Sequence, residues 1–297
     1  MPLAKLVVFH LIISVQTLRE CNNDRYTITY HKIKSCYKSK EAIIAWKNLP
    51  NVRDCMDFVK ERRGFAFNYS PAQAKNYTRG YSKNCQVLGC PDTSNASLDF
   101  DPGFDYYSAY GNLTNVAETS CIKSEGLFKF ISDPMNYTQA IVNCQNHGGD
   151  LADVLSESRT NRLSQMIGNL MSNWYKAAYV GLDDLNEEGL FETAFESYLG
   201  CSKFRAWAPG HPMSKNRHQR CVILDSERTW RVIDCRMELP SICELYPQRP
   251  VGFGFKFMNR NCKKIRNKRD KKKCKEEKAM KKLLDNASRF DQCAFYN

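Results

Sequence analysis

The second half of the chain is organised around YVGLDDLNEEGLF, residues 179–191. The preceding alanines extend its apolar start into AAYVGLDD, which predicts a buried strand that ends in an acidic turn. Three further apolar segments follow, QRCVILDS, TWRVIDC and PSICEL, with turn residues between them. Each of these segments predicts a short strand, so this stretch belongs to a run of strands.

Two amphipathic helices are expected before these strands. In MNYTQAIVNCQNHGGDLADV, Tyr137, Ile141 and Cys144 fall on one helical face, and DLADV leaves as a strand. The second helix lies in SESRTNRLSQMIGNLMSNW, where Ser156 is the expected N-cap. Its apolar stripe consists of Leu163, Ile167, Leu170 and Trp174. Two helices followed by several strands predict an α+β fold.

The chain begins with MPLAKLVVFHLIISVQT, in which Lys5 precedes an apolar run from Leu6 to Val15. This pattern is typical of a secretory signal peptide, and the run is too short to span a membrane. We therefore expect residues 1–17 to be a signal peptide. The alternative is a buried strand at the N-terminus.

Cysteines and glycosylation sequons agree with export. The chain has 14 Cys and no Cys-x-x-Cys pair, so disulfides are expected rather than a zinc framework. No later apolar run reaches the ~18 residues that a transmembrane helix needs. The sequence thus predicts a soluble, secreted glycoprotein. Six Asn-x-Ser/Thr sequons are candidate glycosylation sites, namely Asn68, Asn76, Asn95, Asn112, Asn136 and Asn286.

Residues 18–121 predict a small disulfide-containing domain. The stretch VRDCMDFVKERRGFAFNYSP has Val52, Cys55, Met56 and Val59 at helical spacing, and Gly64 ends the helix. The following FAFNY predicts a strand, as does NCQVLGC. The aromatic, turn-rich DFDPGFDYYSAYGN is expected to form an edge strand and a loop.

These residues resemble the PAN/apple module. The resemblance is carried by Cys55, FAFNY at 65–69, CQVL at 85–88 and FDYYSAYG at 104–111. It implies a helix that is joined by a disulfide to short strands. The second helix Cys of the module is absent here, which leaves its disulfide set open. An unrelated small disulfide domain is the alternative.

Residues 122–246 resemble the C-type lectin-like domain, with its motifs in the family's order. The carriers are the helix with Cys144, GGDLA at 148–152, YVGLDDLNEEGLF, WAPGHP at 207–212, CVIL at 221–224, Trp230, Cys235 and ICE at 242–244. The resemblance implies two disulfides, Cys144–Cys243 and Cys221–Cys235.

The pairing of the other cysteines is open. Cys201 has no partner in the family's pattern, and three Cys lie in the C-terminal tail, so the four could make one or two links between tail and body. The unassigned set is Cys21, Cys36, Cys55, Cys85, Cys90, Cys121, Cys201, Cys262, Cys274 and Cys293.

The resemblance also implies where calcium would bind. Sugar-binding members of the family hold sugar through calcium, which needs six to eight oxygen ligands. They take ligands from Glu-Pro-Asn or Gln-Pro-Asp, from Asn-Asp after the Trp, and from an acidic residue just before a Cys. This chain has Gln219-Arg220 before Cys221. At the other positions it has His211, Pro212, Met213, Arg231 and Val232.

These substitutions run against calcium. Imidazole nitrogen and thioether sulfur are poor ligands for a hard cation, and an Arg ~4 Å away costs about 1–4 kcal/mol. The sequence predicts no calcium, no calcium-dependent sugar binding and no cofactor. Asp184 and Glu188 are expected to form a solvated acidic turn. The loop either contacts protein or acidic glycan or has no ligand.

Residues 247–297 form a basic tail. From Arg249 to Asn297 there are 16 Lys/Arg and 5 Asp/Glu, so this segment carries +11 of the chain's +12. It could bind acidic polysaccharides or stay a solvated charge run, and RNKRD offers a processing site after Arg269. Nucleic acid is not an expected partner of a secreted chain. The candidate polyanion-binding residues are Lys263, Lys264, Arg266, Lys268, Arg269, Lys271, Lys272 and Lys273.

The sequence contains no Gly-x-Ser-x-Gly, His-Glu-x-x-His or Gly-rich phosphate loop, so we predict no enzymatic activity. The favoured function is extracellular recognition of protein or matrix ligands without calcium. One alternative is a lectin that binds sugars at a non-standard site. The other is a binder of acidic polysaccharides through the tail.

Overall fold

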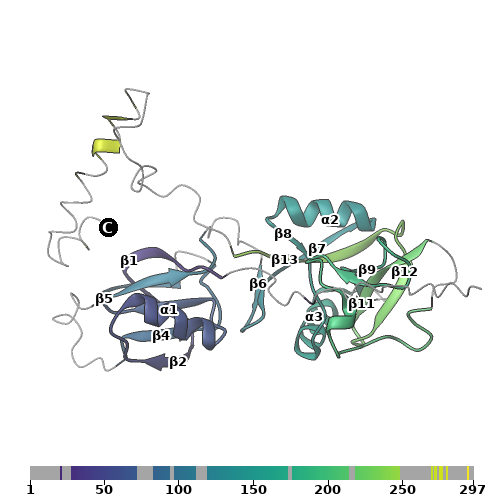
Figure 1. The fold of residues 1–297 in the computed structure, drawn as a ribbon, viewed down its shortest axis with the longest axis horizontal. Coiled ribbons are helices and arrows are strands. Elements are labelled where there is room, and N and C mark those ends of the chain that lie inside the picture. The colour runs from purple at the N-terminus through teal and green to yellow at the C-terminus, as the bar shows by residue number, and fades with distance from the viewer. Residues whose placement is uncertain are drawn as a thin grey trace, which may run out of the picture.

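The structure is a computed structural model that describes most of the chain from residue 28 to residue 247. The N-terminal unit lies within residues 28–111 and the C-terminal unit within residues 119–247 (Figure 1). The described residues are 21, 28–71, 83–93, 97–111, 119–172, 176–213 and 218–247, and in the tail 269, 271, 272, 274–276, 279 and 293.

The N-terminal unit is an antiparallel sheet of five strands in the order β1-β5-β3-β4-β2. Helix α1 (Val52–Glu61) packs against β3 and β4. The strands are β1 (His31–Ser39), β2 (Ile43–Lys47), β3 (Ala66–Tyr69), β4 (Cys85–Leu88) and β5 (Leu98–Ser108).

Helix α1 forms where its spacing predicts it. Asn51 caps its N-terminus by accepting a hydrogen bond from the Asp54 N–H at 2.9 Å. Its buried face carries Cys55, Phe58 and Val59, and Cys55 is bonded to Cys85 at the start of β4. The helix is thus fastened to the sheet both by apolar packing and by a covalent bond.

The prediction of an edge strand in DFDPGFDYYSAYGN is wrong. Strand β5 lies inside the sheet between β1 and β3, and its residues from Gly103 to Ser108 are buried. The edges are β1 and β2, which the sequence pattern did not indicate. Register shifts interrupt both strands, so apolar and polar residues do not alternate cleanly along them.

The C-terminal unit is a mixed sheet with two helices, so the chain as a whole combines helices and sheets. The main strand order is β12-β11-β9-β13-β7-β6, with β10 beside β9 and β8 beside β13. Strand β13 runs antiparallel to β7 and parallel to β9. The helices are α2 (Tyr137–Asn146) and α3 (Glu157–Leu170). The strands are β6 (Ser120–Ile122), β7 (Gly126–Met135), β8 (Gly149–Leu151), β9 (Ala177–Asp183), β10 (Glu192–Thr193), β11 (Gln219–Asp225), β12 (Trp230–Asp234) and β13 (Leu239–Leu245).

Two glycines of the sequence motifs allow this sheet to close. A Cβ on Gly149 would lie 2.0 Å from the carbonyl oxygen of Glu244, and one on Gly181 would lie 2.4 Å from the carbonyl oxygen of Leu151. Both distances are far below contact distance, so no larger residue fits without moving backbone. The GGDLA and YVGL motifs therefore let β8 approach β13 and β9.

Both helices are capped at their N-termini, although only the Ser156 cap was predicted. Asn136 and Gln139 form a capping box on α2, and the Ser156 hydroxyl accepts from the Arg159 N–H at the start of α3. Leu163 and Ile167 are buried as expected. Leu170 is 56% exposed, so its place in the buried stripe is wrong. Trp174 lies outside the described residues.

The disulfides include Cys144–Cys243 and Cys221–Cys235, the two pairs that the resemblance implied. Cys201, whose partner the sequence left open, is bonded to Cys21 and not to a Cys of the tail. The tail is tied to the N-terminal unit instead, through Cys36–Cys293. The other bonds with both ends in the described residues are Cys55–Cys85 and Cys90–Cys121.

The two units are in contact. Cys90–Cys121 links the N-terminal unit to β6, and Leu127 and Leu245 pack in one apolar cluster with Phe65 and other residues of the N-terminal unit. Within the described residues, no helix has the length and hydropathy required to cross a membrane.

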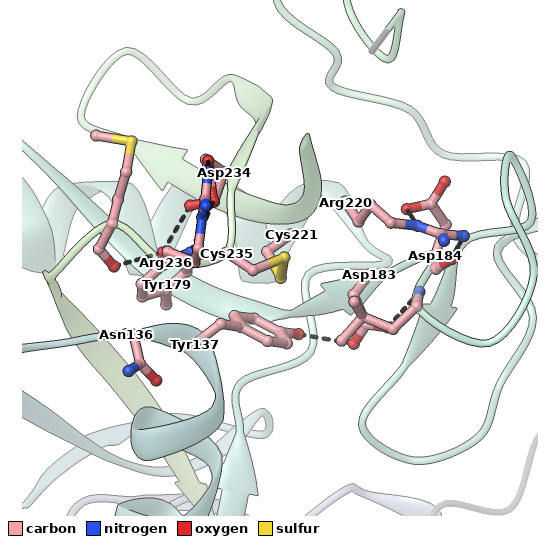
Figure 2. The surroundings of a disulfide bond; sticks show 12 residues. Asn136, Tyr137, Tyr179, Asp183, Asp184, Arg220, Cys221, Asp234, Cys235 and Arg236 are labelled. Atoms are coloured by element: carbon pink, nitrogen blue, oxygen red, sulfur yellow. Dashed lines mark hydrogen bonds and ion pairs between the residues drawn. A yellow bond between two sulfur atoms is a disulfide. The ribbon is translucent and has the colours of Figure 1, made fainter. Parts of the chain in front are cut away.

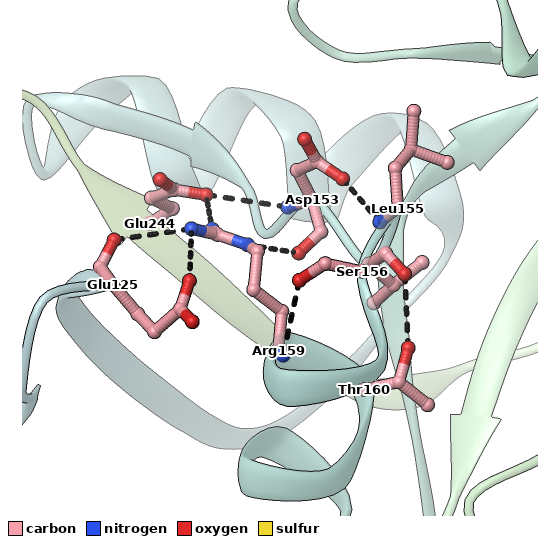
Figure 3. A network of polar contacts seen from close by, with 8 residues as sticks. Glu125, Asp153, Leu155, Ser156, Arg159, Thr160 and Glu244 are labelled. Carbon is pink, nitrogen blue, oxygen red and sulfur yellow. Dashed lines mark hydrogen bonds and ion pairs between the residues drawn. The ribbon is translucent and has the colours of Figure 1, made fainter. Parts of the chain in front are cut away.

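A buried ionic network fastens α3 to the sheet (Figure 3). The Arg159 side chain is 3% exposed and forms an ion pair with the fully buried Glu244 of β13. Its Nε donates to the Asp153 carbonyl at 2.8 Å, and its Nη1 donates to the Glu125 carbonyl at 3.0 Å. The network therefore joins α3, β13 and the segments that contain Asp153 and Glu125.

Loss of the cation should destabilise this unit strongly. We expect Arg159→Met to lower the free energy of unfolding by about 3–5 kcal/mol, because it leaves the Glu244 carboxylate buried without a counterion. Urea unfolding of the disulfide-intact protein, followed by tryptophan fluorescence, measures the loss. The double variant Arg159→Met with Glu244→Gln should lose less free energy of unfolding than Arg159→Met alone. A double variant whose loss equals the sum of the two single losses contradicts the proposed coupling.

Candidate functional site

The sequence-predicted ligand loop, residues 207–213, lies along β12. Its backbone joins that strand through hydrogen bonds from the Ala208 N–H to the Trp230 carbonyl at 2.9 Å and from the Trp230 N–H to the Ala206 carbonyl at 2.7 Å. The Trp230 ring is fully buried, and the rings of Trp207 and Phe204 pack edge-on against it at 5.3 and 5.5 Å between centroids. The start of the loop is thus anchored by aromatic packing.

His211 holds the next part of the loop. Its Nδ1 accepts a hydrogen bond from the backbone N–H of Val232 at 3.0 Å. The following bond to Pro212 is cis, and Met213 is 79% exposed. The loop therefore presents a thioether to solvent, while the imidazole is turned back onto β12.

The two residues after Trp230 also have local roles. The Arg231 Nε donates to the Asp225 carboxylate at 2.9 Å, and the same carboxylate accepts from the Thr229 N–H at 2.9 Å and the Thr229 hydroxyl at 2.6 Å. Val232 is buried in the apolar core. The structure therefore brings together His211, Arg231 and Val232, but each is engaged with protein rather than aimed at a common centre.

A second Arg–carboxylate pair occupies the acidic turn after β9. Asp184 is 4% exposed and accepts from the Gly189 N–H at 2.7 Å, while its other oxygen lies 3.4 Å from the Arg220 Nε (Figure 2). Arg220 also donates to the Asp184 carbonyl. The expectation of a solvated turn is therefore wrong for Asp184, whereas Glu188 is exposed.

Sequence reasoning missed this pair because it treated Arg220 only as the loss of an acid. An Arg at a position where an acid is usual, with an acidic turn nearby in the fold, was the available signal. The Cys221–Cys235 bond next to Arg220 holds β11 to the end of β12 (Figure 2).

Asp183, beside this pair, points the other way, toward α2. The Tyr137 hydroxyl donates to its Oδ2 at 2.9 Å and the Leu185 N–H to its Oδ1 at 3.0 Å. Burial raises the pKa of Asp183 above its ordinary value, although these two hydrogen bonds lower it. Burial also raises the pKa of Tyr137 well above the usual range, with the negative charge of Asp183 adding to the effect. The turn is thus locked to α2 as well as to β11.

The predicted glycosylation sites divide into three groups. Asn68 is 1% exposed, and its side chain is hydrogen-bonded to Ser39 and Gln86. Asn136 is partly exposed at the start of α2. Four predicted sites lie outside the described residues, namely Asn76, Asn95, Asn112 and Asn286.

The predicted polyanion-binding residues are only partly described. Arg269 and Lys272 are exposed, Lys271 is half-buried, and Lys272 lies 3.9 Å from Glu276. The others, Lys263, Lys264, Arg266, Lys268 and Lys273, lie outside the described residues.

Comparison with known proteins identifies the domain that carries this site. The family model described as Lectin C-type domain matches residues 133–245. Residues 133–245 form a C-type lectin domain. The match runs from the end of β7 to β13 and includes the ligand loop and the acidic turn described above.

Several curated relatives share this C-type lectin domain. Collectin-10 of Gallus gallus is 29% identical over 125 residues, which are 42% of this chain and 43% of the relative. C-type mannose receptor 2 of Mus musculus is 24% identical over 196 residues, which are 61% of this chain and 13% of the relative. Hemolymph lipopolysaccharide-binding protein of Periplaneta americana is 27% identical over 129 residues, which are 40% of this chain and 49% of the relative. The chain thus spans less than half the length of each of these relatives.

Solved structures that this chain matches include the cow C-type carbohydrate-recognition domain of CD23, at 22% identity and a TM-score of 0.39. The match covers 44% of this chain and 95% of the CD23 domain. A calcium-independent type II antifreeze protein is 18% identical with a TM-score of 0.38, over 44% of this chain and 94% of its own.

The hydrogen bond of His211 can be tested by amide hydrogen exchange. We expect His211→Ala to speed exchange at Val232 by roughly two- to tenfold, because its N–H loses an acceptor worth about 0.5–1.5 kcal/mol. Met213→Ala is the matched control, since that side chain is exposed, and it should leave Val232 unchanged. Equal acceleration in both variants would show that the loop loosens without involvement of the imidazole.

Proposed function

We propose that this protein is a secreted, glycosylated recognition protein whose C-type lectin domain binds protein or matrix ligands without calcium. The observation that carries the proposal is the Arg220–Asp184 pair. Calcium would need the carboxylate oxygens of the acidic turn, and here a guanidinium supplies the positive charge. A protein cation thus takes over the task of tying this turn to β11.

The ligand loop supports the same proposal. His211 offers nitrogen and Met213 sulfur where oxygen ligands are needed. The Arg231 guanidinium is held beside Asp225, and a positive charge ~4 Å from a cation costs about 1–4 kcal/mol. These contacts favour recognition through the exposed loop surface itself.

The N-terminal unit is proposed to be a PAN/apple-like recognition module. Its helix is bonded to the sheet through Cys55–Cys85, as the resemblance implies, and the five strands are antiparallel. Such a module would add a second contact surface for a ligand. Neither unit carries a motif for catalysis, and we propose that the protein is not an enzyme.

Binding assays with and without a chelator test this function. The full chain is applied to immobilised matrix proteins and to a glycan array, in millimolar calcium and in EDTA. We expect binding to a protein or matrix ligand that EDTA leaves unchanged. Glycan binding that EDTA abolishes would contradict the proposal. Glycan binding that persists in EDTA would favour the alternative of a lectin with a non-standard sugar site.

Replacing the guanidinium should create calcium dependence. We expect Arg220→Glu to destabilise the acidic turn in EDTA, because like charges then face Asp184, and calcium to restore about 2 kcal/mol or more at saturating concentration. Thermal unfolding with and without millimolar calcium measures this. The wild-type chain should show no calcium shift, and Arg220→Ala, which adds no oxygen ligand, is the matched control. A calcium shift in the wild-type chain contradicts the proposal.

Acidic polysaccharide binding through the tail is a second candidate function, favoured by its charge of +11 and by exposed Arg269 and Lys272. Retention on a heparin column tests it. Removal of the whole tail would break Cys36–Cys293, so point variants are preferable. We expect Gln at Arg269, Lys271 and Lys272 to lower the eluting salt concentration. Gln at Arg53, Lys60 and Arg62 of the α1 region removes the same charge elsewhere, and an equal decrease would contradict a specific role of the tail.

A further inference from the structure

We propose that Asn136 carries an N-linked glycan whose first N-acetylglucosamine rests in a shallow apolar groove along α2, and that the Asn68 sequon stays unmodified. The inference rests on the secretion included in the proposed function, because the modification is made in the secretory pathway. The recognition of ligands does not itself require a glycan at Asn136 or a groove that holds it.

The geometry of Asn136 suits modification. Its side-chain Oδ1 accepts a hydrogen bond from the backbone N–H of Gln139 at 3.0 Å. The backbone N–H of Asn136 donates to the Gln139 Oε1 at 3.1 Å. The side-chain nitrogen has no hydrogen-bond partner among the described residues. Figure 2 shows the Asn136 side chain pointing away from the Tyr137 ring. The glycan attaches to this nitrogen, so the cap on α2 survives the modification.

Asn68 has the same sequon in the opposite environment. It sits inside β3, and its side-chain nitrogen donates to the Ser39 carbonyl at 3.4 Å and to the Gln86 Oε1 at 3.3 Å. Its oxygen accepts from the Ser39 N–H at 2.9 Å. A glycan would remove these bonds and force apart the sheet around a residue that is 1% exposed. The fold therefore separates two sequons that the sequence does not distinguish.

The groove begins at Asn136. It has a volume of about 340 Å³ and is lined by Met135, Thr138, Gln139, Val142, Asn143 and Asn146. Met135 and Thr138 flank the modified residue in sequence, and the floor is mostly apolar. Val142, one turn further along α2, is 51% exposed.

A tethered sugar matches this surface. The pyranose ring has an apolar C–H face, and its acetamido methyl can cover Val142. The covalent tether removes most of the entropy cost of association, so even a shallow groove can hold the ring.

The transfer is balanced by a sugar-diphosphate lipid as donor. The bond between C1 of the sugar and the diphosphate oxygen breaks, and C1 bonds to the Asn136 nitrogen. That nitrogen loses one proton to a base of the transferase, and the lipid diphosphate leaves. Thr138 completes the Asn-x-Ser/Thr sequon that the transferase requires.

Mass spectrometry tests which sequon is used. The full chain is secreted from a eukaryotic host, reduced and digested with trypsin, which places Asn68 in peptide 64–75 and Asn136 in peptide 130–159. Enzymatic deglycosylation in heavy-oxygen water converts each glycosylated Asn to heavy Asp. We expect the label at position 136 and none at position 68. An unlabelled Asn136 or a labelled Asn68 overturns the assignment.

Thermal unfolding tests where the sugar rests. The glycan is trimmed to a single N-acetylglucosamine, and the protein is compared with Asn136→Asp, which keeps an N-cap but carries no sugar. We expect the trimmed protein to melt about 2–4 °C higher. Val142 lies at an exposed helix position. When both proteins also carry Val142→Ser, their melting temperatures should no longer differ. An equal difference in both backgrounds, or none in the wild-type background, overturns the seating on α2.

Neither experiment uses calcium or a ligand of the C-type lectin domain. Failure of the glycan assignment would therefore leave the proposed recognition function standing. Failure of the recognition function would in turn leave the labelled peptide and the melting difference as they are.

Discussion

The C-type lectin domain depends on one buried charge. Glu244 is fully buried in β13, the strand that pairs with β7, β8 and β9, and an ionised carboxylate there is tolerated only with a cation in contact. Arg159 supplies that cation from the first turn of α3 and uses its remaining donors on backbone carbonyls at Asp153 and Glu125. Helix α3 can therefore dock in only one position on the sheet. The close approach of Gly149 to Glu244 then aligns β8 with the same strand.

The same chemistry recurs at the candidate site. Arg220 faces Asp184 and Arg231 faces Asp225, so two buried carboxylates that could attract a divalent ion each have a guanidinium instead. These pairs are partly exposed on the Arg side, and each alone contributes little to stability because water screens it. Their effect is mainly on position, since the forked donors fix the direction of the turn and of β12. Under the proposed calcium-independent recognition, the turn and β12 would keep their shape through these protein cations at any calcium concentration.

Motifs with a local physical cause were predictable from the sequence. Ser156 caps α3, as predicted from its place before the helix. The bonds of Cys144 and Cys221 were implied by the family resemblance and not by the local sequence. Features that depend on contacts distant in sequence were not predictable. Burial of Asp184 follows from Arg220, which is 36 residues away, and Asn68 loses its accessibility only when β3 is enclosed in its sheet. The turn of His211 onto Val232 was not predictable either, because it depends on the register of β12.

The long-range disulfides decide which part of the chain is a functional unit. Cys21–Cys201 and Cys36–Cys293 join residues 180 and 257 positions apart, and Cys90–Cys121 crosses from the N-terminal unit to β6. In the chain-entropy model, the two longest of these loops give a disulfide its largest effect, on the order of 5 kcal/mol each. A C-type lectin domain cut out at residues 133–245 would leave Cys201 without its partner and would expose Leu245, which packs against the N-terminal unit. Disulfides therefore cross-link the two units to each other and the tail to the N-terminal unit.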